Sequence, residues 1–401
     1  MLVVERGQQA GSKNVSGGLV YSQVIERVYP DFRTSAPLER AITSHRVVML
    51  GDGRSVALEF ADEGTAESPH NAYTVLRARF DPWMARQAED AGAALITGAT
   101  VDALLVEDGR VAGIRSGPDE FRADVVVIAE GTRSLLLKAA GLREDFSPHD
   151  VSLGVKEVVA LPAAVIEERF LCSAGAGVAC TLLGHTGGIE GGGFLYTNRD
   201  SLSLGVVLKL DSVYQRGRRP HEILDEFKSH PYISRLIEGG EVVEYSAQTV
   251  HRGGYGLPTR LHGDGYLVVG SAARLLLNNV ATLRGMDFAV VSAATAVQAI
   301  LQAREKDSFV ASSLASYAVL LKRTPVYRDW RTFKDVYPLL DNPRIFETYP
   351  DLVCTVLQKL FSPGPEAGKK AVGIVREEMR GKVSTMTLAR DLYRAARGVA
   401  L

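Results

Sequence analysis

The residues best suited to chemistry gather around one glycine. The run Leu267–Val269 is apolar and β-branched, and it ends at Gly270, which small residues follow. An apolar pattern typical of a helix covers 288–300. A strand that ends at a glycine and leads to helix N-termini presents unpaired backbone N–H groups to an anion or a carbonyl oxygen. The stretch therefore indicates a cofactor site.

Several side chains near this stretch could hold charge or move a proton. His251 lies in a strand-to-loop passage, where it is either a proton-transfer group or a structural histidine. Arg274 either supplies a fixed positive charge for a carboxylate, phosphate or enolate, or is a surface residue. Asp287 is either a reactive carboxylate or the cap of the following helix. Further candidates are Tyr245, Tyr255 and Glu130.

Other classes of site lack support in the sequence. No second histidine stands at metal-ligand spacing, and no G-x-S-x-G, HExxH, P-loop or CxxC pattern occurs. We therefore expect no metal site, hydrolase or NTPase. Cys172, Cys180 and Cys354 have no ligand spacing, so we expect reduced thiols and no iron–sulfur cluster in this chain.

Composition is that of a globular protein. The chain has 401 residues, of which 46% are hydrophobic and 23% charged, and this length favours two interleaved domains. The net charge of −1 gives no electrostatic argument for binding nucleic acid. No run of 18 apolar residues and no secretory leader is present, so we expect a cytoplasmic protein.

The first residues form part of a nucleotide-binding pattern. The short apolar run from Met1 ends at the acidic Glu5, as does the second strand of a dinucleotide-binding fold, where the acid takes the adenosine ribose hydroxyls. That strand normally follows a G-x-G-x-x-G turn about 20 residues upstream. Three explanations stay open for its absence from this sequence: a misplaced start, a trimmed chain, or true loss of the turn. We take true loss forward as our working hypothesis.

Periodicity divides the rest of the chain. A hairpin turn is expected at Asp108–Gly109, and 123–131 reads as a buried parallel strand. Period-two alternation dominates 151–260, which predicts an antiparallel substrate sheet, and helical patterns follow residue 306. The predicted division is a remnant nucleotide-binding domain at 1–150 and 261–305, a substrate domain at 151–260, and a helical C-terminal cap at 306–401.

The motif around Gly270 resembles the second FAD-binding motif of the FixC and electron-transfer-flavoprotein:quinone oxidoreductase family, which is related to the geranylgeranyl reductases. Gly270, Ala272, Ala273, Asn278, Asn279, Arg284, Gly285, Met286, Asp287 and Ala289 match it. The segment 11–18 also resembles the family's Gly-Ser-Lys-Asn-Val-Ser-Gly-Gly. Two positions depart from the motif: Ser271 replaces an Asp, and Arg274 replaces a Gly.

The resemblance implies an α/β fold of the glutathione-reductase-like FAD/NAD(P)-binding class, with a parallel sheet truncated at its N-terminal end, an inserted antiparallel sheet and a helical cap. It implies FAD as cofactor, with the missing Asp on the ribityl chain and the missing Gly allowing close backbone approach. The implied cofactor-binding residues are Glu5, Ser16, Gly17, Gly18, Arg77, Glu130, Gly131, Gly270, Ser271, Gly285, Met286 and Asp287. The predicted catalytic residues are His251, Tyr245 and Arg274.

Arg77 has two interpretations. The resemblance implies that it lies near the cofactor, whereas its position also suits an ordinary salt bridge at a strand end. We further expect Asp81 to cap a helix whose first residue is Pro82.

Three functions stay open. The first is a FixC-like protein with a degenerate FAD site, which performs redox-neutral (cyclisation or isomerisation) or partner-assisted chemistry on an apolar polyene, isoprenoid or polyketide-like substrate. The second is a conventional FAD-dependent oxidoreductase that reduces a quinone or an isoprenoid double bond. The third is a non-catalytic electron-transfer subunit. The resemblance implies a ferredoxin or an electron-transfer flavoprotein as partner. The basic C-terminal helix from Met386 suits either solvent or peripheral contact with the inner face of a membrane.

Overall fold

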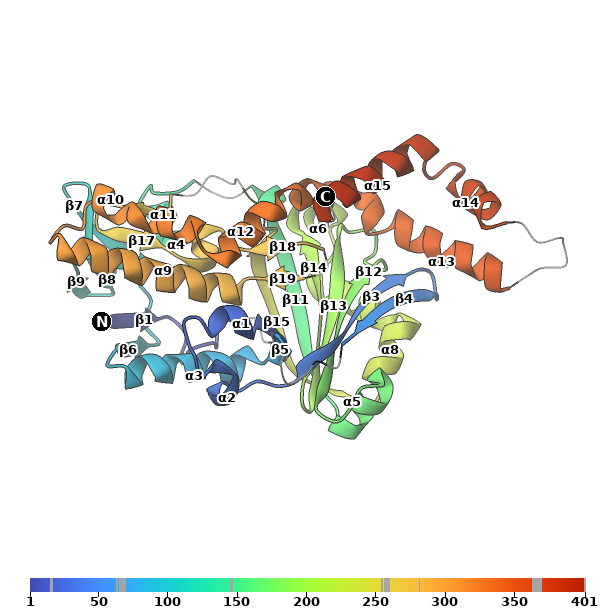
Figure 1. Ribbon diagram of the computed structural model, residues 1–401, viewed down its shortest axis with the longest axis horizontal. Helices are drawn as coiled ribbons and strands as arrows, with labels where there is room; N and C mark the ends of the chain where they lie inside the picture. Colours follow the sequence, from blue (N-terminus) through green and yellow to red (C-terminus); the bar gives the residue numbers. More distant parts are fainter. Residues whose placement is uncertain are drawn as a thin grey trace.

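A computed structural model describes residues 1–14, 17–62, 64, 70–144, 147–253, 255, 260–280, 282–362 and 370–399. Its largest element is a nine-stranded sheet in the order β15-β11-β14-β13-β12-β3-β5-β2, with β4 also pairing β3 (Figure 1). The strands are β2 (Gly18–Tyr21), β3 (Ala41–Leu50), β4 (Ser55–Ala61), β5 (Ala72–Val75), β11 (Val151–Ala160), β12 (Ala176–Leu183), β13 (Gly191–Thr197), β14 (Ser201–Lys209) and β15 (Glu241–His251).

One face of this sheet forms a hydrophobic core. Leu202, Leu204, Val206 and Leu208 alternate along β14 and are fully buried. They pack with residues of the helices α5 (Ala163–Phe170), α6 (Leu210–Arg216), α7 (Pro220–Ser229) and α8 (Pro231–Ile237). Each such side chain contributes about 1.5–3 kcal/mol by leaving water. The opposite face carries small and polar residues, such as Gly205 and Ser203, together with the stacked rings of Phe194 and Tyr196.

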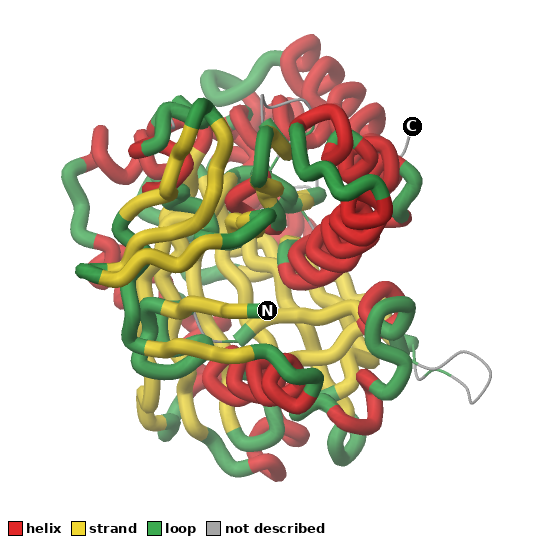
Figure 2. Tube along the Cα trace, turned by 90° about the vertical axis from the view of Figure 1, so that its left-hand side faces the viewer, coloured by secondary structure: helices red, strands yellow, loops and turns green. Residues whose placement is uncertain are grey.

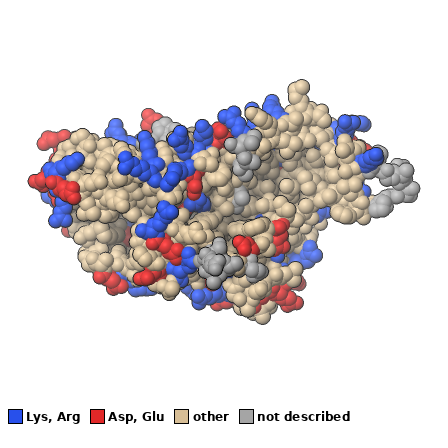
Figure 3. All heavy atoms as spheres, in the orientation of Figure 1, with Lys and Arg blue, Asp and Glu red and all other residues tan. Residues whose placement is uncertain are grey.

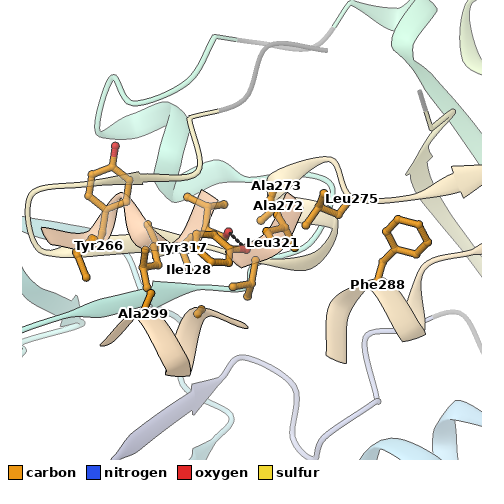
Figure 4. Close-up of a cluster of buried hydrophobic side chains, with 14 of the residues drawn as sticks. Ile128, Tyr266, Ala272, Ala273, Leu275, Phe288, Ala299, Tyr317 and Leu321 are labelled. Atoms are coloured by element: carbon orange, nitrogen blue, oxygen red, sulfur yellow. Dashed lines mark hydrogen bonds between the residues drawn. The ribbon is translucent and has the colours of Figure 1, made fainter. Parts of the chain in front are cut away.

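A second core surrounds the stretch at Gly270. The strand β17 (Tyr266–Val268) pairs in parallel with β10 (Val126–Ile128) and antiparallel with β16 (His262–Gly263). It packs against the long helix α9 (Met286–Glu305) and against α11 (Ser316–Lys322), as Figure 4 shows. The Tyr317 hydroxyl donates a 3.0 Å hydrogen bond to the buried carbonyl of Val268, which fixes α11 on this sheet.

The strands that the sequence assigned to the nucleotide-binding domain lie in two separate sheets. The strand β1 (Leu2–Glu5), next to the N-terminus in Figure 2, pairs in parallel with β6 (Ala94–Thr97), and this pair belongs to a different sheet from β10 and β17. Among the strands that the structure describes, β1 and β10 each have one partner. The helix α3 (Arg77–Asp90) packs beside β6. An antiparallel group of β7 (Ala103–Glu107), β8 (Arg110–Ser116) and β9 (Asp119–Arg122) completes this part.

Local predictions have mixed outcomes. The hairpin turn is confirmed, because Asp108 and Gly109 both adopt positive φ between β7 and β8. The predicted start of the helix at Pro82 is wrong: α3 begins at Arg77, and Asp81 instead pairs with Arg77. The antiparallel sheet also takes strands from residues 18–75, whereas the sequence placed it in 151–260.

Short helices and the C-terminal cap complete the chain. The short helices are α1 (Ser22–Ile25), α2 (Phe32–Ser35), α4 (Leu135–Ala139) and α10 (Ala311–Leu314), and the cap comprises α12 (Pro325–Thr332), α13 (Thr348–Phe361), α14 (Ala371–Met379) and α15 (Thr385–Val399). Within the described residues, α9 has the length and hydropathy to cross a membrane, but several of its residues, from Phe288 to Ala303, are buried in the second core. Such burial is typical of a core helix.

Candidate functional site

Two glycines lie where the sheet meets the start of α9. Gly17 has φ +75°, and a Cβ there would lie 2.9 Å from the Cβ of Ser203 and still closer to its hydroxyl. A Cβ at Gly18 would lie 2.9 Å from Cε of Met286. The positive φ and the contact with Ser203 favour glycine at position 17, whereas the contact at Gly18 is with the flexible end of Met286, which can move aside.

A buried ion pair fixes the start of α9. Arg284 donates to Asp287 at 2.8 and 2.5 Å and to Asp329 of α12 at 2.8 Å. Its guanidinium carbon lies 4.9 Å from the centroid of the Tyr21 ring. Burial raises the pKa of Asp287, and the opposing charge of Arg284 offsets part of that rise. Asp287 is thus a partner of Arg284 rather than an isolated carboxylate.

Arg284 stays charged in this setting. Burial works against its charged form, but the carboxylates of Asp287 and Asp329 outweigh it, so the pKa of Arg284 is raised. The N-terminus of α9 adds a positive end of the helix dipole beside the cation. Because Asp287 and Asp329 neutralise Arg284, only the N-terminus of α9 favours an electron-rich ring edge or an oxyanion at this corner.

The backbone at Gly270 and the side chain of Arg274 are both held by the protein itself. The Gly270 amide donates to the hydroxyl of Ser292 at 3.0 Å, so this N–H is engaged. Arg274 adopts φ +58°, a left-handed conformation that glycine occupies without strain. Its side chain is 8% exposed, so the surface alternative is wrong. Burial lowers the pKa of Arg274, while Asp150 and Tyr337 favour the charged form.

His251 sits beside two cations. It is 1% exposed at the end of β15. Burial first, and then the charges of Arg143 and Arg274, lower the pKa of His251 to about 3, although it contacts the backbone of Ser271. The imidazole is therefore neutral at physiological pH, which does not suit a proton donor. Arg143 itself donates to the carbonyl of Ala272 at 3.0 Å.

The structure brings together only part of the predicted catalytic set. His251 and Arg274 lie close to each other, as their electrostatic interaction shows. Tyr245 lies directly across from Glu157, on the face of the sheet opposite to Lys156, and is 48% exposed. Tyr255 stacks edge-on against Trp330 with ring centroids 5.2 Å apart. Neither tyrosine joins the cluster at Gly17.

Residues predicted for the adenosine end make local contacts. The Glu5 carboxylate accepts the Gly7 amide at 2.6 Å. The Glu130 carboxylate accepts the amides of Leu136 and Leu137 at 2.8 and 3.1 Å, which caps α4. Arg77 forms a two-pronged pair with Asp81 at 2.5 and 2.7 Å, which fits the salt-bridge interpretation.

Other implied cofactor residues lie at backbone turns or outside the described chain. Gly131 has φ +76°, and no atom of the described residues lies within 4 Å of a Cβ built there. Gly285 precedes the first residue of α9, Met286. Ser16 lies outside the described residues. Among the described residues, no group of three or more His, Cys, Asp or Glu side chains could hold a metal.

FAD fits one end of this site better than the other. Gly17, Gly18 and the Arg284–Asp287 pair form a tight and charged corner, and no described atom crowds a Cβ built at Gly131. At the second motif, Ser271 supplies no carboxylate and Arg274 adds a buried side chain where the family has none. The residues present therefore fit the ring end of a flavin and depart from the pattern at its ribityl and phosphate end.

Sequence reasoning missed Lys156, which the structure places at the tight corner. Its ammonium donates a hydrogen bond to the carbonyl of Gly17, and it is 4% exposed. The only signal in the sequence was a lysine within an alternating strand, and alternation does not reveal which face meets a site.

Comparisons with known proteins decide the family. Protein FixC of Escherichia coli (strain K12) is 38% identical over 395 residues, which cover 95% of this chain and 92% of that protein. The probable electron transfer flavoprotein-quinone oxidoreductase YdiS of the same strain is 39% identical over 401 residues, covering 99% and 92%. This chain belongs to the FixC and electron-transfer-flavoprotein:quinone oxidoreductase family. It is therefore a member of a family of FAD-dependent flavoprotein oxidoreductases, as the resemblance predicted.

Family models and solved structures agree with this assignment. Residues 151–250 match the model described as ETF-QO, ubiquinone-binding, and 337–400 match the ETF-QO/FixC family C-terminal domain. Residues 19–168 match a tryptophan halogenase model. A geranylgeranyl bacteriochlorophyll reductase-like protein from Thermoplasma acidophilum has a TM-score of 0.70 at 19% identity, covering 98% of this chain and 92% of that one. The myxobacterial chondrochloren halogenase CndH has a TM-score of 0.61 at 16% identity, covering 97% and 92%. These structures confirm the predicted flavoprotein fold class.

The close packing at Gly17 predicts a specific loss of stability. Gly17→Ala should lower the free energy of unfolding by about 1–3 kcal/mol more than Gly53→Ala, because overpacking adds to the conformational strain. Gly53 is a matched control, since it has φ +64° and open space around its Cα. Urea unfolding followed by circular dichroism measures the difference. Equal losses in the two variants would show that the segment is not packed as described.

Proposed function

We propose that this protein passes electrons to a quinone, with a flavin at the corner formed by Gly17, Gly18 and Arg284. One observation carries the proposal: the Gly17–Gly18 segment packs against the antiparallel sheet. The part of the sheet that it contacts lies in residues 151–250, which match a ubiquinone-binding model. The sheet face at that point carries Lys156 and Ser203 beside the stacked rings of Phe194 and Tyr196. A flat ring with polar oxygens suits such a face.

The chain's own residues hold and orient the reacting groups. A bound flavin would supply the electron transfer itself. Arg284 is neutralised by Asp287 and Asp329, so it is the N-terminus of α9 that would place a partial positive charge where a reduced, anionic ring would lie. The Gly17–Gly18 segment brings backbone rather than side chains to the ring, and its tight packing excludes water from that side.

A weak hold on FAD is part of the proposal. Ser271 has no carboxylate for the ribityl hydroxyls, and the left-handed Arg274 brings a side chain where the family has only backbone. We therefore propose a degenerate site that binds FAD weakly, and chemistry that is assisted by a partner.

Surface charge supports an acidic electron-transfer partner. Lys and Arg side chains gather over the upper helices in Figure 3. Exposed cations of this region follow α11 and continue past α12: Lys322, Arg323, Arg328, Arg331 and Lys334. Because Asp329 of α12 pairs with Arg284, this surface adjoins the proposed flavin corner. A ferredoxin or an electron-transfer flavoprotein with an acidic docking face would fit it.

Contact with a membrane surface belongs to the same proposal, because quinones with isoprenoid tails reside in membranes. Leu392 and Tyr393 of α15 are 60% and 62% exposed, next to the exposed Arg390 and Arg394. Apolar and basic side chains together favour peripheral binding to anionic lipid. We propose that α15 lies against the inner face of the membrane.

A second candidate is redox-neutral chemistry, cyclisation or isomerisation, on an apolar polyene, isoprenoid or polyketide-like substrate. The substitutions at Ser271 and Arg274 favour this function, because they weaken FAD binding. A protein that had lost FAD would still have the sheet face on which a substrate binds. It is distinguished by a rearranged product formed without any reductant. A non-catalytic electron-transfer subunit would give neither product nor quinone reduction, yet would still bind its partner.

The proposal predicts electron transfer to a quinone. When the protein is supplied with excess FAD and reduced without oxygen, a short-chain ubiquinone should reoxidise the flavin at least about tenfold faster than it reoxidises free reduced flavin. Stopped-flow absorbance of the flavin measures both rates. Equal rates with and without the protein would contradict the proposal.

The degenerate site predicts a gain of FAD binding on repair. The double variant Ser271→Asp with Arg274→Gly should bind FAD about tenfold or more tightly than the wild type, because a ribityl hydrogen bond is gained and the backbone is opened. Arg274→Ala is the control, since it removes the charge but keeps the Cβ at φ +58°. Fluorescence quenching of FAD gives the affinities. If the repaired and wild-type proteins bind alike, these two positions do not limit FAD binding.

A further inference from the structure

A buried lysine on the substrate sheet has no role in the function described so far. Lys156 lies on β11 and is 4% exposed. Its ammonium donates to the carbonyl of Gly17 and lies 5.1 Å from the centroid of the Phe194 ring. Burial of an ammonium group is costly unless it is hydrogen-bonded on several sides. An ammonium has three donors, so one carbonyl and one ring leave capacity for a further acceptor.

Polar atoms without partners surround this lysine. Ser246 of β15 lies directly across from Lys156, and its hydroxyl is buried without a hydrogen-bond partner among the described residues. Within the same part of the chain, the side-chain carbonyl of the fully buried Asn198 also lacks a partner, although its amide donates to Ser203 at 3.0 Å. Ser203 in turn lies against Gly17. Unpaired buried polar groups are rare, and several in one place indicate a ligand site.

Room for a ligand lies next to Lys156 along the strand. Gly154 is two residues away, so it lies on the same face of β11. Among the described residues, a Cβ added at Gly154 would meet only the carbonyl of Gln248, at the ordinary contact distance of 3.5 Å. No other described atom therefore crowds this position beside Lys156.

The charges around Lys156 keep its proton exchangeable near neutral pH. Burial lowers the pKa of Lys156 to about 7, Arg77 of α3 lowers it further, and Glu244 of β15 acts in the opposite direction. An unfolded lysine titrates near 10.5, so between pH 7 and 10.5 the unfolded chain binds more protons and this group favours folding more as pH rises. Below pH 7 the folded protein carries a buried ammonium that seeks an acceptor.

We propose that Lys156 is the hydrogen-bond donor that recognises a carbonyl oxygen of the quinone on this sheet face. The ligand would take its ring position next to Gly154 and its oxygen next to the lysine ammonium and the Ser246 hydroxyl. The inference rests on the proposed function, and it assigns the recognition of the quinone to particular residues. A lysine that only fixed the Gly17 segment would affect stability but not the pH dependence of quinone binding.

The test is quinone binding without flavin. Affinity for a ubiquinone with one isoprene unit is measured by isothermal titration at about pH 6 and about pH 8.5, on either side of the titration of Lys156. The proteins are the wild type, Lys156→Met and Lys228→Met. Lys228 is a matched control, because it pairs at 2.9 Å with Glu157 on the opposite face of the sheet. Thermal unfolding confirms that each variant is folded.

The expected result is a pH-dependent affinity that Lys156 alone controls. Wild type and Lys228→Met should bind about tenfold more tightly at the lower pH, when the ammonium is charged. Lys156→Met should lose about tenfold at the lower pH and show no difference between the two. Equal affinity of Lys156→Met and wild type would overturn the inference and leave the proposed function standing.

Two further outcomes are decisive without relying on the variant. A wild-type affinity that is the same at both pH values would overturn the inference even if Lys156→Met did not fold. Absence of quinone binding by the wild type would overturn the proposed function together with the inference. Protection of Lys156 from acetic anhydride by the same quinone, read by mass spectrometry, would place the ligand at the ammonium.

Discussion

The passage of Gly17 and Gly18 between the antiparallel sheet and α9 is the constraint on which the site depends. A side chain at Gly17 would collide with Ser203, which fixes the segment against the sheet. A side chain at Gly18 would only displace the flexible end of Met286 on the helix. The Arg284–Asp287 pair then anchors the helix end, and Lys156 anchors the segment through the Gly17 carbonyl. Three parts of the chain that are distant in sequence thereby form one corner.

The site is uneven along the length of the cofactor that the family uses. Its ring end retains tight glycines, a buried ion pair and a helix N-terminus. At its other end, Ser271 stands where the family has a carboxylate. Arg274 has a left-handed backbone conformation there, and it interacts electrostatically with His251, Asp150 and Tyr337. Burial first, and then the charges of Arg143 and Arg274, lower the pKa of His251, so its imidazole is neutral and is not a source of protons. Substrate recognition then falls to the sheet face.

Much of this architecture could be predicted from local patterns, because a strand that ends at Gly270 and the period-two alternation of 151–260 depend on neighbouring residues. Contacts between distant segments could not. Strands β3 and β5 join the substrate sheet by long-range pairing, and the groups whose charges act on Arg274 come from residues 150 and 337. Alternation shows that Lys156 lies on one face of its strand, but not that this face meets Gly17. The start of α3 was misplaced because Asp81, a good cap by type, pairs with Arg77 instead.

The most direct test of this account compares flavins of different length. Titration of the flavin-free protein with riboflavin and with FAD, followed by fluorescence quenching, separates the ring end from the phosphate and adenosine end. If the ring end supplies most of the binding, the two affinities should agree within about tenfold, or about 1.4 kcal/mol. Binding of FAD about a thousandfold or more tightly than riboflavin would show that the phosphate end is intact and would contradict the account.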